Sequence, residues 1–247
     1  MKATPQVGRR KPRATGATAG AARGARTAKP PRRKRPVLAQ HRHTLLEEAR
    51  NLIEERGLKG FGIRALSARS GIGHRTIYML YGSKEELIAA ALQEYMEETR
   101  AKFVQSEQFE TIGGMLKILE TGAEVRRAIR NYMRAIDTLY FSLPDSPRFH
   151  GVVRAARRSK FEQWINASMR AGILKAWVDP EMAAEDQLRA EIILTHDWCA
   201  GTLKDDEYDF RRKRSFLLLA LAIVESPHDA RIERALIDLT RQHSAAR

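Results

Sequence analysis

The chain has 247 residues and a formal net charge of +14, from 44 lysines and arginines against 30 aspartates and glutamates. This length is enough for one large domain or two small ones. The single cysteine excludes an intrachain disulfide and agrees with a reducing cytoplasm, where we expect the protein to lie. The longest apolar run, residues 216–224, is too short to span a bilayer, so we expect no membrane partner.

The excess positive charge lies at the N-terminus. Residues 1–46 contain 13 basic residues and no acidic one, which leaves 31 basic against 30 acidic residues in the rest of the chain. Residues 1–36 hold almost no large apolar side chain, so they cannot bury enough surface to fold. We predict a disordered basic arm at residues 1–38 that holds DNA phosphates non-specifically, with a merely solubilising extension as the alternative.

The rest of the chain has helical periodicity and no strand pattern, so we predict an all-α fold. The first apolar stripe ends at Gly57 and consists of Leu45, Leu46, Ala49, Leu52 and Ile53. A short helix at residues 64–70, a glycine turn at 71–73 and a second short helix at 74–80 follow. The side chains expected to face a core here are Leu66, Ile72, Ile77 and Leu80. This order predicts a helix-turn-helix, whose second helix enters the major groove of DNA.

The outer face of this unit supplies the candidate DNA contacts. We predict that His74, Arg75 and Thr76 face base edges, whereas Tyr78 and Lys84 contact phosphates. Ser83 and Glu86 form a capping box for the next helix, and Lys84 lies in its first turn, where free N–H groups favour an anion. The predicted DNA-binding set is Arg64, Gly73, His74, Arg75, Thr76, Tyr78, Met79 and Lys84. An ordinary helical hairpin with a polar surface is the alternative.

Further helices are predicted along residues 85–247. Apolar side chains recur at helical spacing over residues 125–140, which predicts one helix of about four turns. Asp179-Pro180 is an N-cap followed by proline at the first helical position, and the helix that it starts reaches about Leu203. Ser226-Pro227 repeats this pattern and is predicted to start the last helix.

Two of these helices are apolar on more than one face, so we expect them to be buried by their own domain and by a partner. The predicted dimer-interface residues are Leu188, Ile192, Cys199, Leu218 and Leu221. Large, adaptable side chains on neighbouring helices also predict a small-molecule pocket, with plain core packing as the alternative for each residue. The candidate pocket residues are Tyr132, Met133, Ile136, Tyr140, Phe161, Trp164, Met169 and Trp198.

Charged and catalytic motifs add little to this list. Arg154, Arg157, Arg158 and Lys160 form a basic cluster that is either a solvated face or an attractor of an acidic ligand. The seven histidines have no metal-ligand spacing, and no Walker, Rossmann, GxSxG or HExxH pattern is present. We therefore expect no metal, no cofactor and no catalysis, and a helical enzyme is the least supported alternative.

Residues 45–92 resemble the DNA-binding domain of the tetracycline-repressor (TetR) family. The matching segments are Leu66-Ser67, Ser70-Gly71-Ile72-Gly73, Thr76-Ile77-Tyr78, Tyr81 and Ser83-Lys84-Glu85-Glu86-Leu87. The chain departs from the family pattern at three positions. Gly73 replaces the usual capping serine, Gly62 stands where a threonine often caps the preceding helix, and Tyr81 replaces a core phenylalanine.

The resemblance implies a bacterial, nucleoid-associated homodimer that binds a palindromic operator in double-stranded DNA and is released by a small-molecule effector. It implies a helix-turn-helix domain at residues 39–84. A larger helical domain for effector binding and dimerisation follows at residues 85–247, where the last long helices form a four-helix bundle with a second copy. A DNA-binding architectural protein that depends on the basic arm and has no effector is the alternative from another class.

Overall fold

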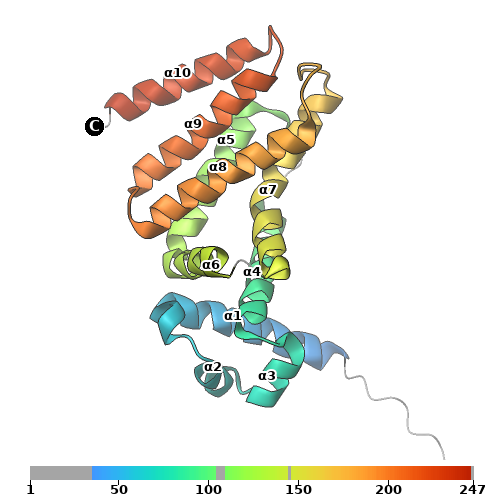
Figure 1. The fold of residues 1–247 in the computed structure, drawn as a ribbon, viewed down its shortest axis with the longest axis vertical. Helices are drawn as coiled ribbons and strands as arrows, with labels where there is room; N and C mark the ends of the chain where they lie inside the picture. The colour runs from blue at the N-terminus through green and yellow to red at the C-terminus, as the bar shows by residue number, and fades with distance from the viewer. Residues whose placement is uncertain (1–34, 104–108, 144–145, 246–247) are drawn as a thin grey trace, which may run out of the picture. The chain divides into compact units, whose positions relative to one another are not determined.

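The computed structural model describes residues 35–103, 109–143 and 146–245 (Figure 1). These ranges contain helices and, apart from one isolated bridge between Leu174 and Val224, no β-structure, which confirms the predicted all-α fold. Pro36–Arg247 forms one compact unit. The predicted arm lies outside the described residues up to residue 34, and its last four residues already belong to the first helix.

The helices are α1 (Arg35–Gly60), α2 (Ile63–Ser70), α3 (His74–Tyr81), α4 (Lys84–Phe103), α5 (Ile112–Ala128), α6 (Arg130–Ser142), α7 (Pro147–Arg170), α8 (Pro180–Ala200), α9 (Asp205–Ile223) and α10 (Asp229–Ala245). Figure 1 shows α4 leading from the group α1 to α3 toward the later helices. Helix α4 packs against α3 and α7, while α7, α8, α9 and α10 pack in succession. None of the described helices is long and apolar enough to cross a membrane.

Glycines set the turns between the first helices. Gly57 has φ +66°, which interrupts the helical path near the end of α1, where the sequence predicts a stop. Gly71 has φ +70° after α2, and its N–H donates to the Ser67 carbonyl. These turns place Leu66 and Ile77 in one buried cluster with the apolar stripe of α1 and with the first turns of α4. The predicted helix-turn-helix is therefore present.

One predicted helix start and one predicted continuous helix need correction. The helix expected over residues 125–140 is divided at Ile129, whose φ of −123° and ψ of 43° separate α5 from α6. The last helix begins at Asp229 rather than at Ser226-Pro227. The start of α8 is as predicted, because the Asp179 side chain accepts hydrogen bonds from the N–H groups of Glu181 and Met182.

Candidate nucleic-acid interface and ligand cavity

Helix α3 presents an uncovered face. Ile77 is buried on the inner side, whereas His74 and Arg75 are exposed and Tyr78 and Met79 have exposed fractions of 52% and 76%. Leu80, which we expected in the core, is 40% exposed. The outer face therefore carries the guanidinium group of Arg75, the imidazole of His74 and the phenol of Tyr78. Their exposed donors can form hydrogen bonds in a DNA groove.

Three further predicted DNA-binding residues lie in α2, in α3 or at its start. Thr76 is half-buried on α3, and Arg64 is exposed on α2. Gly73 is the N-cap residue of α3 and makes no side-chain cap bond, as expected for a glycine there. The contacts of all these residues with DNA remain predictions.

Lys84 has a bonding pattern that sequence reasoning missed. Its Nζ donates to the carbonyl oxygens of Leu58 at 3.2 Å and Phe61 at 2.8 Å, and it lies 5.1 Å from the centroid of the Phe61 ring. The ammonium group thus ties the start of α4 to the carbonyls around the end of α1. The sequence contained a signal for this contact, namely a lysine in the first turn of a helix. The helix dipole disfavours a cation there unless an acceptor elsewhere offsets the cost.

The capping box at the start of α4 is half formed. Ser83 Oγ accepts a hydrogen bond from the Glu86 N–H at 3.1 Å, as predicted. The Glu86 carboxylate does not return to the Ser83 N–H but pairs with Arg148 of α7 at 2.9 Å. One end of α4 is therefore bonded both to the helix-turn-helix and to the larger helical domain.

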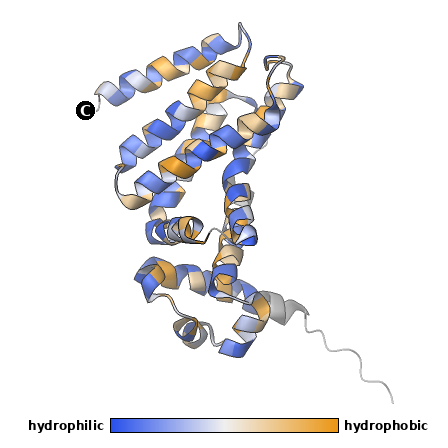
Figure 2. Ribbon diagram, viewed as in Figure 1, coloured by the Kyte–Doolittle hydropathy of each residue, from blue (hydrophilic) through white to orange (hydrophobic). Residues whose placement is uncertain are grey.

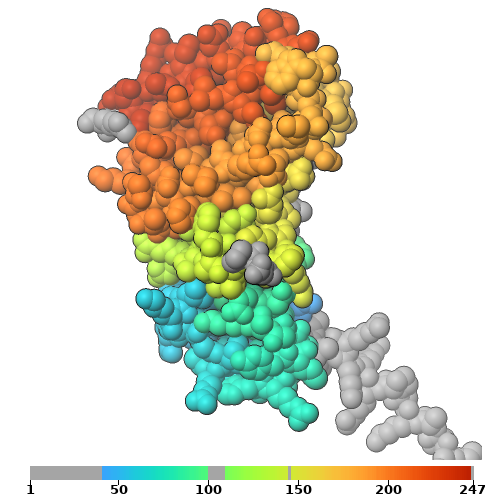
Figure 3. Space-filling model, viewed as in Figure 1, coloured from blue at the N-terminus to red at the C-terminus, as the bar shows by residue number. Residues whose placement is uncertain are grey.

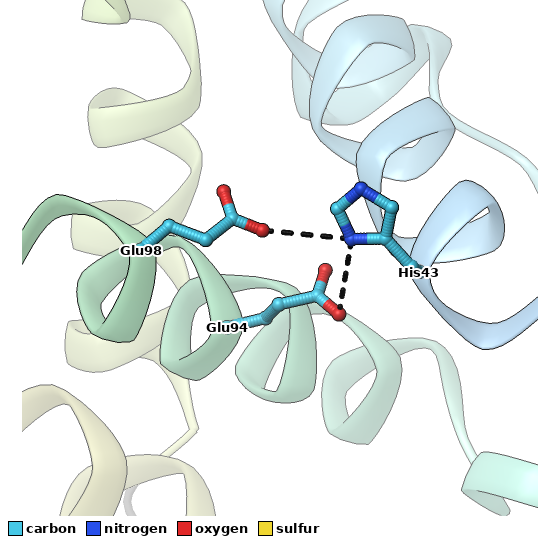
Figure 4. Close-up of side chains that lie close together, drawn as sticks. All are labelled: His43, Glu94 and Glu98. Atoms are coloured by element: carbon cyan, nitrogen blue, oxygen red, sulfur yellow. Dashed lines mark ion pairs between the residues drawn. The ribbon is translucent and has the colours of Figure 1, made fainter. Parts of the chain in front are cut away.

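A charged cluster joins α1 to the middle of α4. Figure 4 shows His43 facing two glutamates of α4, with Nδ1 3.5 Å from an oxygen of Glu94 and 3.5 Å from an oxygen of Glu98. Three such ligand atoms lie close enough together to hold a metal ion. However, Arg50 also pairs with both carboxylates, at 3.2 and 3.6 Å, and already offsets their charge. We therefore interpret this cluster as a tie between two helices.

A cavity of about 440 Å³ lies among α4, α5, α6, α7 and α9. This volume is in the range of small-molecule sites. Its wall is mainly apolar and includes Leu92, Tyr95, Met96, Phe109, Ile118, Val125, Ile129, Met133, Ile136 and Val153. Five basic side chains also line it, namely Lys117, Arg126, Arg157, Lys160 and Arg212.

The cavity corrects most of the predicted pocket. Met133 and Ile136 line it, whereas the other six predicted residues do not. Tyr132, Phe161, Trp164 and Trp198 are buried in the core, Met169 is 50% exposed, and Tyr140 stacks on His150. Periodicity identified the apolar faces of these helices, but it does not show whether the opposite helix fills the space between them.

The basic cluster predicted on α7 divides between two environments. Arg154 and Arg158 pair with Glu185 and Glu162 toward the surface. In contrast, Arg157 is 4% exposed and Lys160 has a side-chain exposure of 13%, and both line the cavity. A solvated face, the default interpretation of the sequence, is therefore wrong for these two residues, since they lie one helical turn apart on the inner side.

One buried carboxylate holds most of the basic wall together. Glu191 of α8 is 3% exposed and accepts hydrogen bonds from Arg126 at 2.6 Å, Arg212 at 3.0 Å and Lys160 at 3.4 Å. Although burial opposes its charge, the surrounding cations hold the pKa of Glu191 well below its usual range. Burial, with repulsion from Arg126 and Arg212, lowers the pKa of Lys160 to about 7, against the attraction of Glu191.

The predicted dimer residues also divide into two groups. Leu188, Ile192 and Cys199 are buried within the chain itself, so their assignment to an interface is corrected: their side chains fill its own core. Burial raises the pKa of the Cys199 thiol to about 12, which agrees with an inert thiol. Leu218 is 38% exposed and Leu221 is half-buried, in the apolar second half of α9 that Figure 2 shows in orange.

Comparison with known proteins agrees with this geometry. Residues 45–91 match the family model for bacterial regulatory proteins of the tetR family. A TetR transcriptional regulator from Rhodococcus sp. RHA1 has 18% identity and a TM-score of 0.57, over 74% of this chain and 97% of that chain. No curated protein matches the chain significantly.

Two further solved structures have the same fold. SmeT, the repressor of the Stenotrophomonas maltophilia multidrug efflux pump SmeDEF, has 17% identity and a TM-score of 0.55 over 76% of this chain and 92% of its own. Thermus thermophilus FadR, a TetR-family repressor in complex with lauroyl-CoA, has 14% identity and a TM-score of 0.57 over 75% and 97%.

The fold and the uncovered face of α3 define a DNA-binding protein of the helix-turn-helix class. Residues 45–91 match the DNA-binding domain of the TetR family, and the chain has the fold of solved TetR-family transcriptional regulators.

Proposed function

We propose that the chain is a homodimeric repressor that binds a palindromic operator and is released when a small molecule enters the cavity. Helix α4 carries this proposal. Its residues Leu92, Tyr95, Met96 and Thr99 line the cavity. The same helix is bonded to α1 through Lys84 and through the ion pairs of Arg50. A ligand that displaces α4 therefore changes the position of the helix-turn-helix.

Such a ligand acts by binding one of two dimer states more tightly. One state spaces the two copies of α3 about one turn of DNA apart, roughly 34–36 Å, or a multiple of it. The ligand shifts the equilibrium between the two dimer states toward the state with the other spacing. The size of this shift is limited by the difference between the ligand's affinities for the two states. Repressors with this fold include SmeT and the lauroyl-CoA complex of FadR.

Footprinting and competition binding with the full chain test the operator function. We expect a palindromic site to be preferred over random DNA, and we expect this preference to persist at high salt, because base contacts do not depend on counterion release. Arg75→Ala relaxes specificity at one base pair in each half-site, at about 1–3 kcal/mol. Arg56→Ala, an exposed arginine of α1, is the matched control. Binding of all DNA alike at high salt would contradict the proposal and favour an architectural protein.

A further inference from the structure

Arg157 has no partner for its charge among the described residues. It is 4% exposed, and neither terminal nitrogen of its guanidinium group has a hydrogen-bond partner there. Its guanidinium carbon lies 5.9 Å from the centroid of the Tyr140 ring. Because a guanidinium group stays protonated in proteins, this is a permanently buried, unpaired charge, which is costly to stability.

The neighbouring charges do not supply the missing partner. Glu191 is bonded to Arg126, Lys160 and Arg212, and no described carboxylate lies within ion-pair distance of Arg157. Asp137 is buried nearby: its Oδ2 lies 2.8 Å from His196 Nδ1, and its Oδ1 has no hydrogen-bond partner among the described residues, but neither oxygen is within ion-pair distance of Arg157. Burial and repulsion from Arg126 lower the pKa of Arg157, against the opposing influence of Tyr208, Glu191 and Asp137.

A second unpartnered donor borders the same cavity. One terminal nitrogen of Arg126 is bonded to Glu191, and the other is buried without a partner among the described residues. Arg126 and Arg157 come from α5 and α7 and both line the cavity, whose remaining wall is mainly apolar. The two unused terminal nitrogens of Arg157 and the one of Arg126, beside an apolar wall, complement a molecule with an acidic group and an apolar body.

We propose that the cavity binds an amphipathic organic anion, whose carboxylate, sulfonate or phosphate group accepts hydrogen bonds from Arg157 and Arg126. Its apolar body packs against the side chains of α4 and α6, among them Met96, Met133 and Ile136. The inference rests on the proposed effector site and names its ligand class. It also accounts for the retention of a buried cation that weakens the free protein.

Calorimetric titration of the full-length chain with three matched ligands tests the charge preference. The ligands are decanoate, decanol and decyltrimethylammonium, which share an apolar chain and differ in charge. Decanoate binds at least about tenfold more tightly than the other two, and 8-anilinonaphthalene-1-sulfonate, an anion of another shape, competes with it. Preference for the alcohol or the cation overturns the inference, as does the absence of binding of both anions at about 1 mM.

Variants at Arg157 separate a ligand contact from a structural role. Arg157→Met loses at least about tenfold in decanoate affinity, keeps its decanol affinity and has a higher Tm without ligand, because an unpaired charge is removed. Arg157→Lys retains part of the preference. Arg154→Met, one turn away and paired with Glu185 outside the cavity, is the control that leaves decanoate affinity unchanged. A lower Tm in Arg157→Met would show that the guanidinium group stabilises the fold and would overturn the inference.

Operator binding is measured separately, on protein without ligand. If operator recognition fails but decanoate still binds through Arg157, the repressor function is wrong and the anion site stands. If a neutral or cationic ligand binds and releases the operator, the effector function stands and the anion site is wrong.

Discussion

Lys84 joins the end of α1 to the start of α4 through a single ammonium group, which donates to two backbone carbonyls. In the sequence it was predicted to contact a phosphate, and a third N–H remains for that purpose. Both roles belong to one side chain, so its removal has two separable effects. The residue stabilises the helix-turn-helix and also holds the helix that leads to the cavity.

Lys84→Ala should lower the free energy of unfolding by about 1–2 kcal/mol, because two charge-assisted hydrogen bonds to carbonyls are lost. It should also weaken binding to all DNA sequences alike. Thermal denaturation and DNA titration measure the two effects. Lys59→Ala removes the same charge from an exposed position in the last turn of α1 and should leave Tm nearly unchanged. Equal Tm values for both variants would count against the structural role.

Lys160 predicts a pH dependence of anion binding. Burial lowers its pKa to about 7 in the free protein, and an anion beside Nζ raises it again. Binding above pH 7 therefore takes up a proton. Decanoate affinity should fall as pH rises from about 7 to 9, by up to about tenfold per pH unit, since its carboxylate stays ionised throughout.

The charged groups facing Lys160 do not titrate in that window. They are Glu191, whose pKa is well below its usual range, and the arginines Arg126 and Arg212, with Arg157 on the same helix. Calorimetry in buffers of different ionisation enthalpy counts the protons taken up. Lys160→Met should make decanoate affinity independent of pH, and an unchanged pH profile in that variant would assign the proton to another group.

Among the secondary-structure elements, those with strong local signals were predictable from the sequence. Gly71 after α2 and Asp179 before α8 specify a turn and a cap through their own backbone and side-chain chemistry, and both are where the sequence places them. The break at Ile129 carries no such signal, because its apolar neighbours continue the helical period across it. Tertiary packing, which periodicity does not contain, decides this element.

The cavity was the least predictable part of the molecule for the same reason. A wide apolar face marks Tyr132 and Ile136 alike, yet Tyr132 packs into the core and its hydroxyl donates to the Ile88 carbonyl at 3.2 Å. Buried Arg157 was even harder to identify, since a run of basic residues ordinarily indicates a surface. The pattern of side-chain types along a helix predicts which of its faces is buried. Whether a cavity lies beside that face depends on the side chains of the helix packed opposite.

The N-cap of α8 allows a test at the scale of one element. Asp179→Ala removes an acceptor for two N–H groups and should cost about 1 kcal/mol of stability, which denaturant titration measures. Asp179→Ser keeps a capping oxygen and should recover most of it. If the alanine and serine variants have equal denaturation midpoints, the capping hydrogen bonds contribute nothing to stability and packing alone holds the start of α8.

At the scale of the whole molecule, we propose that α8 and α9 supply the surface for a second copy. Both helices are seen in Figure 3, and Ile193 of α8 and Leu218 of α9 are 53% and 38% exposed in the single chain. Leu218→Arg places a charge in the proposed interface, which is unfavourable when it is buried without a partner. The variant should be monomeric in sedimentation and should lose operator binding.

Met169→Arg is the matched control for the dimer, because Met169 is 50% exposed on α7 and lies outside the proposed interface. It should remain dimeric and bind the operator. If the Leu218 variant sediments as a dimer with full operator affinity, the interface lies on other helices. If the Leu218 variant stays dimeric but no longer binds the operator, the substitution affects the spacing of the two recognition helices and not the assembly of the dimer.

The basic N-terminal segment allows non-specific and specific DNA binding to be separated in one molecule. Removing residues 1–34 takes away 11 basic residues and no acidic one, and it leaves α1, which begins at Arg35. Each phosphate contact contributes about −0.9 to the slope of log K against log salt, so the truncated chain should show a shallower slope and weaker binding at low salt.

Helicity and dimerisation should be unchanged by this deletion, because the described helices and the proposed interface lie at residues 35–245. The ratio of operator to random-DNA affinity should hold or rise, since base readout is assigned to α3 and non-specific attraction is what the deletion removes. Filter binding or fluorescence anisotropy over a salt series measures both quantities. A collapse of that ratio would mean that the N-terminal segment itself reads sequence, as arms do when they enter a minor groove beside the site.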